Sequence, residues 1–279
     1  RLSMPISRIY NAAAAGRRKR PLSYGKTDMG DSPVFSYGKF SFDYAVNFAG
    51  LSLGFEDKNG MYHYKRNITG WKHEAHIAVE NGAFYLQPIE PLNLPDNVTD
   101  FIEIKFREIT IEPNGKTVVF LTMPIEIGVF LETKNGDRTL LDIVSFCHPK
   151  FSLYGAASRG VITRYHESEV YSLPPAVRNY QEGLLRLELE NNTDEWATVS
   201  RVVLYQKGLN LYYDESSVSA CAKMIVQSSD VADVFGVDQP IRDGMTECVQ
   251  VFEQRRTTPF CNIEGALLDA TFTMDMGMR

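Results

Sequence analysis

Residues 151–171 form the stretch with the most side chains that could do chemistry. It contains Tyr154, Arg159, Arg164, Tyr165, His166, Glu167 and Glu169. Cationic side chains beside carboxylates could bind an anionic ligand or transfer protons, but the same residues would also suit a surface strand with weak cross-strand ion pairs. On a strand, Arg164 and His166 would share one face and Tyr165 would point to the other. We therefore interpret the seven residues as candidate contacts to a ligand or partner and assign none of them to catalysis.

Histidines around residue 73 give a second candidate site, for a metal ion. His73 and His76 lie three residues apart, with His63 nearby. Paired metal-binding histidines need a spacing of two on a strand, or of three or four on a helix. Because residues 75–79 have the composition of a strand, His73 and His76 should point to opposite faces. A cupin-like, metal-dependent protein stays open as an alternative, but we predict no metal ligand and no cofactor.

Several motifs of common enzyme classes do not occur in the sequence. It has no Gly-x-Ser-x-Gly, no Gly-x-x-x-x-Gly-Lys-Ser/Thr, no Gly-x-Gly-x-x-Gly and no His-Glu-x-x-His. β-Sandwich glycosidases need none of these, because the fold brings their two carboxylates together. A carbohydrate-active or carbohydrate-binding jelly-roll domain is therefore another alternative. It would place aromatic side chains such as Tyr154, Tyr165 or Trp196 in a concave groove beside carboxylates.

Turn signals show how these residues would be positioned. Four Asn-Gly pairs occur, at 59–60, 81–82, 114–115 and 135–136. Asn-Gly tolerates the positive φ angles of tight hairpin turns, so each pair predicts a strand reversal. Residues 117–131 are apolar on both faces except at Thr122 and Glu126, and Pro124 is predicted to divide them into two strands. No segment shows a sustained helical period, so we expect only single helical turns.

Many short strands separated by turns predict an all-β protein. We expect an antiparallel, tandem β-sandwich of jelly-roll-like form with few short helical turns. The predicted regions are a basic N-terminal extension over residues 1–30, which we expect to be flexible, a first sandwich over 31–115 and a second sandwich over 116–279.

Charge is distributed unevenly along the chain. Residues 1–28 hold seven basic residues and one acidic residue, while the whole chain has a net charge of −6, so residues 29–279 carry −12. An acidic body repels nucleic acid, which makes nucleic acid an unsuitable partner for it. The basic residues Arg17, Arg18, Lys19 and Arg20 could instead contact an acidic surface on a protein or membrane.

The compartment is predicted from cysteines and apolar runs. The four cysteines include no Cys-x-x-Cys pair, as is usual for thiols in a reducing compartment. No apolar run approaches the roughly 18–20 residues that span a bilayer, and we identify no export signal. We therefore expect a cytoplasmic protein.

Several strings resemble one known family. They are Pro124–Phe130, Phe151–Gly155, Arg159–Tyr165, Ser168–Tyr171 and the opening Tyr37–Phe42. Together they resemble an archaeal family known as domain of unknown function 432, over roughly residues 35–275. The resemblance brings no activity, cofactor or catalytic residue with it. It implies a cytoplasmic archaeal protein and points to a membrane-associated, channel-type partner.

These observations favour a non-catalytic role. Strands and turns are well specified, whereas no nucleophile, base or ligand set has a productive spacing. We therefore predict a binding or accessory scaffold protein whose partner is another protein. An exposed sheet edge or the stretch 151–171 is the expected contact.

Overall fold

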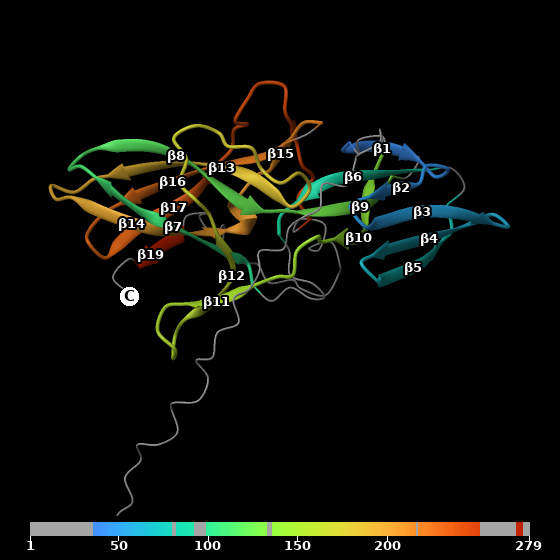
Figure 1. The fold of residues 1–279 in the computed structure, drawn as a ribbon, viewed down its shortest axis with the longest axis horizontal. Helices are drawn as coiled ribbons and strands as arrows, with labels where there is room; N and C mark the ends of the chain where they lie inside the picture. The colour runs from blue at the N-terminus through green and yellow to red at the C-terminus, as the bar shows by residue number, and fades with distance from the viewer. Residues whose placement is uncertain are drawn as a thin grey trace, which may run out of the picture. The chain divides into compact units, whose positions relative to one another are not determined.

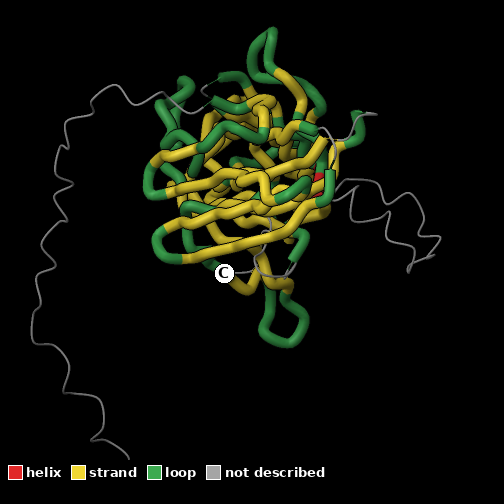
Figure 2. The backbone as a smooth tube through the Cα atoms, turned by 90° about the vertical axis from the view of Figure 1, so that its right-hand side faces the viewer, coloured by secondary structure: helices red, strands yellow, loops and turns green. Residues whose placement is uncertain are grey.

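The computed structural model describes residues 36–79, 82–91, 99–132, 136–215 and 217–251, and the backbone of 272–275. Their regular secondary structure consists of strands, joined by turns and loops, and one short 3₁₀ helix, η1 (Gln206–Gly208) (Figure 2). The predicted all-β class is therefore confirmed. The described part of the chain contains no helix of the length and apolar character that a membrane crossing requires. The basic residues 17–20 lie outside the described residues.

Two four-stranded sheets form a first sandwich. Sheet A has the order β1-β6-β9-β10 and sheet B the order β2-β3-β4-β5, with antiparallel pairing throughout. The strands are β1 (Gly38–Ser41), β2 (Val46–Phe48), β3 (Leu51–Lys58), β4 (Met61–Ile68), β5 (Trp71–Ile77), β6 (Ala83–Ile89), β9 (Glu126–Glu132) and β10 (Arg138–Val144). Side chains from both sheets, including Tyr64, Phe84 and Leu86, meet in an aromatic-rich core.

Two further sheets form a second sandwich (Figure 1). Sheet C has the order β11-β12-β7-β14. Sheet D has the order β18-β15-β16-β13-β8, with β17 pairing to β16 and β19 to β17. The strands are β7 (Phe101–Ile111), β8 (Lys116–Pro124), β11 (Phe151–Tyr154), β12 (Val161–Glu167), β13 (Glu182–Asn191), β14 (Ala197–Tyr205), β15 (Tyr212–Tyr213), β16 (Val218–Val226), β17 (Val231–Val237), β18 (Thr246–Glu247) and β19 (Phe272–Asp275). Their shared core is mainly aliphatic, with Ile104, Leu187 and Met224 fully buried.

Two strand pairs in the second sandwich are parallel. They join β12 to β7 and β13 to β16, whereas the remaining pairs of these sheets are antiparallel. Parallel neighbours need a long connection between them. These two pairs therefore bring together segments that are far apart in the sequence.

The Asn-Gly pairs give mixed outcomes. The turn at Asn59-Gly60 has positive φ at both residues and joins the antiparallel pair β3–β4. The strands before and after 135–136, β9 and β10, also pair antiparallel. The predicted hairpin at 114–115 is wrong, because β7 and β8 belong to different sheets, and the one at 81–82 is wrong for the same reason, since β5 lies in sheet B and β6 in sheet A. In both cases the chain crosses from one sheet to another instead of reversing within it. Asn81 and Asn135 lie outside the described residues.

The predicted division of residues 117–131 is confirmed. β8 ends at Pro124 in sheet D and β9 begins at Glu126 in sheet A, so the chain passes between the sandwiches at Ile125. The expected border between residues 115 and 116 is not a border between sheets, since β6 pairs with β9 and β7 pairs with β14. Whether 31–115 and 116–279 fold as separate regions stays a prediction.

Candidate functional site

The β11–β12 hairpin carries the sequence-predicted site. Its turn, residues 155–160, is closed by hydrogen bonds from the Arg159 and Gly160 amides to the Ala156 carbonyl, at 3.0 and 2.6 Å. A Cβ atom at residue 160 would lie 2.8 Å from that carbonyl oxygen and 2.9 Å from the Leu153 side chain. Glycine is therefore required at the point where the turn returns to β12.

Apolar side chains on this hairpin are exposed. Phe151, Leu153, Val161 and Ile162 keep 37–50% of their surface accessible. Leu153 lies opposite Ile162 in the register, and Phe151 is two residues along on the same face. The ten exposed large hydrophobic residues in the described part of the chain thus include four on one short hairpin. Such clustering marks an interaction surface more often than scattered exposure does.

The seven predicted contact residues lie on both faces of the hairpin and in its turn. Arg164 and His166 share a face, and Tyr165 points to the other, as strand alternation predicted. Tyr154 is buried, Arg159 is exposed in the turn, and Glu167 and Glu169 are exposed. The Tyr165 hydroxyl donates to Glu167 Oε1 at 2.6 Å. The structure therefore does not bring the seven together around one point, and their role as contacts stays a prediction.

Two of these residues face the interior of the molecule. The His166 Nε2 atom lies 2.9 Å from the Thr122 hydroxyl of β8, and burial lowers the pKa of this histidine below its usual value. Burial also lowers the pKa of Arg164, which the nearby Glu126 carboxylate partly counteracts. His166 therefore connects β12 to β8, and Arg164 is buried instead of presenting its charge to solvent.

A row of polar side chains crosses all four strands of sheet C. At its centre is Glu103 of β7, which is buried. The Ser152 hydroxyl donates to Glu103 Oε2 at 2.5 Å, the Thr163 hydroxyl lies 3.3 Å from the same oxygen, and Arg201 Nη1 lies 3.3 Å from Oε1. We call Ser152, Thr163, Glu103 and Arg201 the Glu103 row. It connects the hairpin at one edge of the sheet to β14 at the other.

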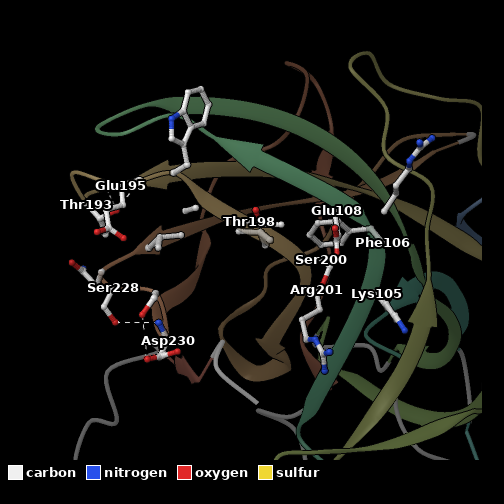
Figure 3. A pocket seen from close by; sticks show the side chains of 17 residues that line it. Lys105, Phe106, Glu108, Thr193, Glu195, Thr198, Ser200, Arg201, Ser228 and Asp230 are labelled. Carbon is white, nitrogen blue, oxygen red and sulfur yellow. Dashed lines mark hydrogen bonds between the residues drawn. The ribbon is translucent and has the colours of Figure 1, made fainter. Parts of the chain in front are cut away.

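A groove of about 1200 Å³ lies beside β14 at that other edge (Figure 3). We call it the β14 groove. It is lined by three segments that are distant in sequence, namely residues 105–108 of β7, 193–201 of the β13–β14 loop and β14, and 226–230 of the β16–β17 turn. In the view of Figure 3, Thr193, Glu195, Ser228 and Asp230 lie toward one end, and Lys105 and Arg201 lie toward the other.

A bulge in β7 shapes the wall of the groove. The register pairs Val199 with Ile109 but Arg201 with Lys105, so residues 106–108 stand opposite Ser200 alone. Arg107 and Glu108 are consequently both exposed, although they are adjacent on a strand. Bulges commonly re-aim side chains next to binding sites. Here the bulge adds two charged groups to the groove.

A buried asparagine fixes the loop that carries Trp196. Asn191 is fully buried, and its amide nitrogen lies 2.7 Å from the Glu195 carbonyl and 3.0 Å from the Glu112 carbonyl. Its side-chain oxygen accepts from the Thr193 amide at 3.1 Å and the Thr193 hydroxyl at 2.8 Å. Trp196 follows directly and remains 68% exposed. The indole is therefore exposed from a loop with little freedom to rearrange.

Comparison with known families assigns the chain to one of them. A family model described as "Protein of unknown function (DUF432)" matches residues 36–275. The chain belongs to the DUF432 family. No curated protein and no solved structure matches it. The DUF432 match runs from the residues just before β1 to the end of β19, so both sandwiches, the hairpin and the β14 groove lie within it.

The histidines considered for a metal site lie on sheet B of this DUF432 fold. The rings of His63 and His76 stack with centroids 4.5 Å apart, and His63 Nε2 lies 3.3 Å from Glu74 Oε2. His73 instead approaches Tyr64 of the core, so His73 and His76 point to opposite faces as predicted. Among the described residues, no three His, Cys, Asp or Glu side chains are grouped as metal ligands would be.

Sequence reasoning did not find the β14 groove of this DUF432 chain. Its three segments have no shared motif, and only the parallel and crossover pairings of sheets C and D bring them together. Of the aromatic residues named for a carbohydrate groove, Trp196 lines this one, whereas Tyr154 and Tyr165 belong to the hairpin. An exposed tryptophan in a polar loop was the signal that pointed in this direction.

Proposed function

We propose that this DUF432 protein is a non-catalytic accessory protein that binds another protein through the β11–β12 hairpin. The observation that carries the proposal is the exposed apolar surface formed by Phe151 and Leu153 of the outer strand β11 and by Ile162 of the neighbouring strand β12. An isolated apolar face of this kind is normally covered in a working protein. The scaffold role in this proposal is to hold a partner protein at that face.

Backbone groups add to the attraction of this surface. In the described part of the chain, β11 is the last strand of sheet C, so one side of it has no neighbouring strand. An edge strand of this type is a template for a strand supplied by a partner. Main-chain hydrogen bonds would supply affinity, and the alternating apolar side chains would supply specificity.

Charge indicates the chemistry of the partner. Residues 143–166 contain no acidic residue but include Lys150 and Arg159, which are exposed on either side of β11. The rest of the body is acidic, so this basic surface is distinctive. The expected partner therefore offers an extended segment with alternating apolar side chains and flanking carboxylates.

A lipid surface is a weaker candidate for the same hairpin. The turn that would enter the membrane first, Gly155–Gly160, consists of small and polar residues, whereas interfacial anchors place large apolar or aromatic side chains there. Lipid tails also cannot hydrogen-bond to the free edge of β11. A protein strand satisfies both requirements.

Quantitative affinity capture from an extract of the source organism tests the proposal. The full chain is compared with a Phe151→Ser/Leu153→Ser variant, and each captured protein is purified and titrated against both. We expect the double variant to raise the Kd of the true partner by about tenfold or more, because central apolar contacts dominate interface energy. Met61→Ser is the matched control, since Met61 is 45% exposed but lies on β4.

Two results would contradict this function. One is a purified partner that binds the double variant as tightly as the unaltered chain. The other is hairpin-dependent binding to vesicles of anionic phospholipid in the absence of any protein partner. Either would remove the hairpin from the role of a protein-docking surface.

The basic segment supplies a second, separable contact in this proposal. Arg17, Arg18, Lys19 and Arg20 lie outside the described residues, and their expected partner is an acidic surface. A cytoplasmic, membrane-associated channel-type protein, as the family resemblance implied, fits both contacts. Removing residues 1–28 should weaken binding at low salt more than at high salt, because exposed charges are screened, whereas the hairpin variant should weaken it at both.

A further inference from the structure

We propose that the β14 groove is a second binding site, for a neutral oligosaccharide, with Trp196 as the platform on which a sugar ring stacks. The site is independent of the β11–β12 hairpin, because its lining residues come from β7, the β13–β14 loop with β14, and the β16–β17 turn. The ligand class follows from three features of the groove: its tryptophan, its polar lining and its size.

The tryptophan has both the exposure and the rigidity of a stacking platform. Trp196 presents an indole that is largely accessible to solvent, on a loop held by the hydrogen bonds of buried Asn191. A large apolar ring on a backbone that is already fixed loses less entropy when a ligand covers it than one on a mobile loop. The flat C–H face of a pyranose is an apolar surface of matching shape, and the indole N–H can serve a hydroxyl at its margin.

The lining suits hydroxyl groups better than it suits charge. Three basic residues and three acidic residues line the groove: Lys105, Arg107, Arg201, Glu108, Glu195 and Asp230. Their charges balance, so neither a polyanion nor a polycation is favoured. Between them are hydroxyl and amide groups, including Thr193, Ser200 and Gln227. Such a set of donors and acceptors matches a neutral molecule with many hydroxyls.

Several of these groups are available to a ligand. In the described part of the chain, no hydrogen bond or ion pair is formed by the side chains of Arg107, Glu108 or Glu195, and all three are exposed. Arg201 differs, because it is held by Glu103 at 3.3 Å. The groove thus combines one fixed guanidinium with free carboxylates that can accept from sugar hydroxyls.

The size of the groove indicates more than one sugar ring. Sites for single small ligands usually enclose about 300–1,000 Å³, and this one encloses about 1200 Å³. It also runs along β14 from the loop at Thr193 to Arg201. A chain of linked rings would fill this length, whereas a monosaccharide would cover only the area around Trp196.

Tryptophan fluorescence gives a direct test, because the chain has two tryptophans. In a full-length Trp71→Phe protein, Trp196 is the sole reporter. It is titrated with mono- and oligosaccharides of glucose, mannose, galactose and xylose, and with polygalacturonate and chitosan oligomers as charged counterparts. We expect a neutral oligosaccharide to shift the emission of Trp196 and to bind more tightly than its monosaccharide.

Calorimetry on matched variants completes the test. Trp196→Ala should raise the Kd for the oligosaccharide by about tenfold or more. Trp71→Ala removes an equally exposed indole, at 70%, from sheet B and should leave the affinity unchanged. Phe151→Ser/Leu153→Ser should also leave it unchanged, which separates this site from the hairpin. The proposal is overturned if no neutral oligosaccharide binds at millimolar concentration, if Trp196→Ala binds as well as the parent, or if only a charged saccharide binds.

Discussion

The two outer strands of sheet C, β11 and β14, differ in how their edges are covered and in the polarity of the surface beside them. Beyond β14 the fold provides cover, because β17 and β19 of sheet D lie in contact with it (Figure 1). The surface left open there is polar and carries one rigidly held tryptophan. No described strand covers β11, and the surface there is apolar and basic.

This difference matches the two kinds of partner proposed above for the two edges. Proteins usually protect a sheet edge with charges, bulges or neighbouring elements, and β14 has both a bulge opposite it and neighbours beside it. The unprotected apolar β11 edge is therefore the unusual one. In the proposals above, a partner protein covers the β11 edge, whereas an oligosaccharide binds at the β14 edge.

The largest expected effect is at the β14 edge, from Asn191→Ala. The substitution removes the donor to the Glu112 and Glu195 carbonyls and the acceptor for Thr193 in a site without solvent access. We expect a loss of about 3 kcal/mol in the free energy of unfolding, because buried groups left without partners are costly. Chemical denaturation measures it.

The neighbouring residue is a matched control for this variant. Asn192 has the same side chain but is exposed, and only its backbone amide is engaged, with the Val226 carbonyl at 3.0 Å. Asn192→Ala should change stability by less than about 0.5 kcal/mol. Equal losses in the two variants would show that the hydrogen bonds of the Asn191 side chain do not specifically stabilise the loop that carries Trp196.

The second largest effect should come from Glu103→Ala, which breaks the link between the two edges. Ser152, Thr163 and Arg201 would all lose their shared carboxylate. We expect a loss of about 2 kcal/mol, with faster amide hydrogen exchange in β11 as well as β14. Faster exchange at one edge alone would mean that the Glu103 row does not couple them.

Particular residues show how far the sequence predicts this fold. The Asn59-Gly60 turn and the break at Pro124 were predictable, since both depend on local backbone preferences. The crossing at Asn114-Gly115 was not, because a positive φ fixes a change of direction but not which sheet receives the next strand. The turn at Thr69-Gly70 has positive φ at both residues, like Asn59-Gly60, although its sequence contains no Asn-Gly pair.

The candidate sites show a similar division. Strand alternation correctly separated Arg164 and His166 from Tyr165, but it could not show that the first two face the interior. Alternation with the buried Ile102 and Ile104 would place Glu103 on the outer face of the sheet, yet Glu103 is buried among three hydrogen-bond donors. Burial on the outer face of a sheet depends on neighbours distant in sequence, which alternation within one strand cannot reveal.

A smaller effect, at the β11 edge, depends on pH through His166. Because burial lowers the pKa of this ring from its usual 6.5, the folded protein keeps it neutral while the unfolded chain takes up a proton as the pH falls. Stability contributed by His166 is therefore present at neutral pH and is lost as the pH drops through about 6.5. His166→Gln, which can still bond to Thr122, should show a smaller fall in Tm between pH 7 and pH 5.

Comparison of the variant with the parent isolates this histidine. The pKa of Glu90 is raised by burial to about 7, so its contribution to stability is lost as the pH rises over the same range. Glu90 is present in both proteins, so its effect cancels in the difference between the two Tm curves. Parallel curves would contradict a role for His166 in holding β12.

The smallest expected effect distinguishes the two edges most sharply. Phe151→Ser/Leu153→Ser should change the free energy of unfolding by less than about 1 kcal/mol in chemical denaturation, since exposed side chains contribute little to stability. If those side chains instead covered the core, the variant would be destabilised by several kcal/mol. A variant that is stable but no longer binds the partner protein would mean that the apolar residues of β11 contribute to binding and not to folding. The residues around Trp196, by contrast, would maintain the fold as well as the groove.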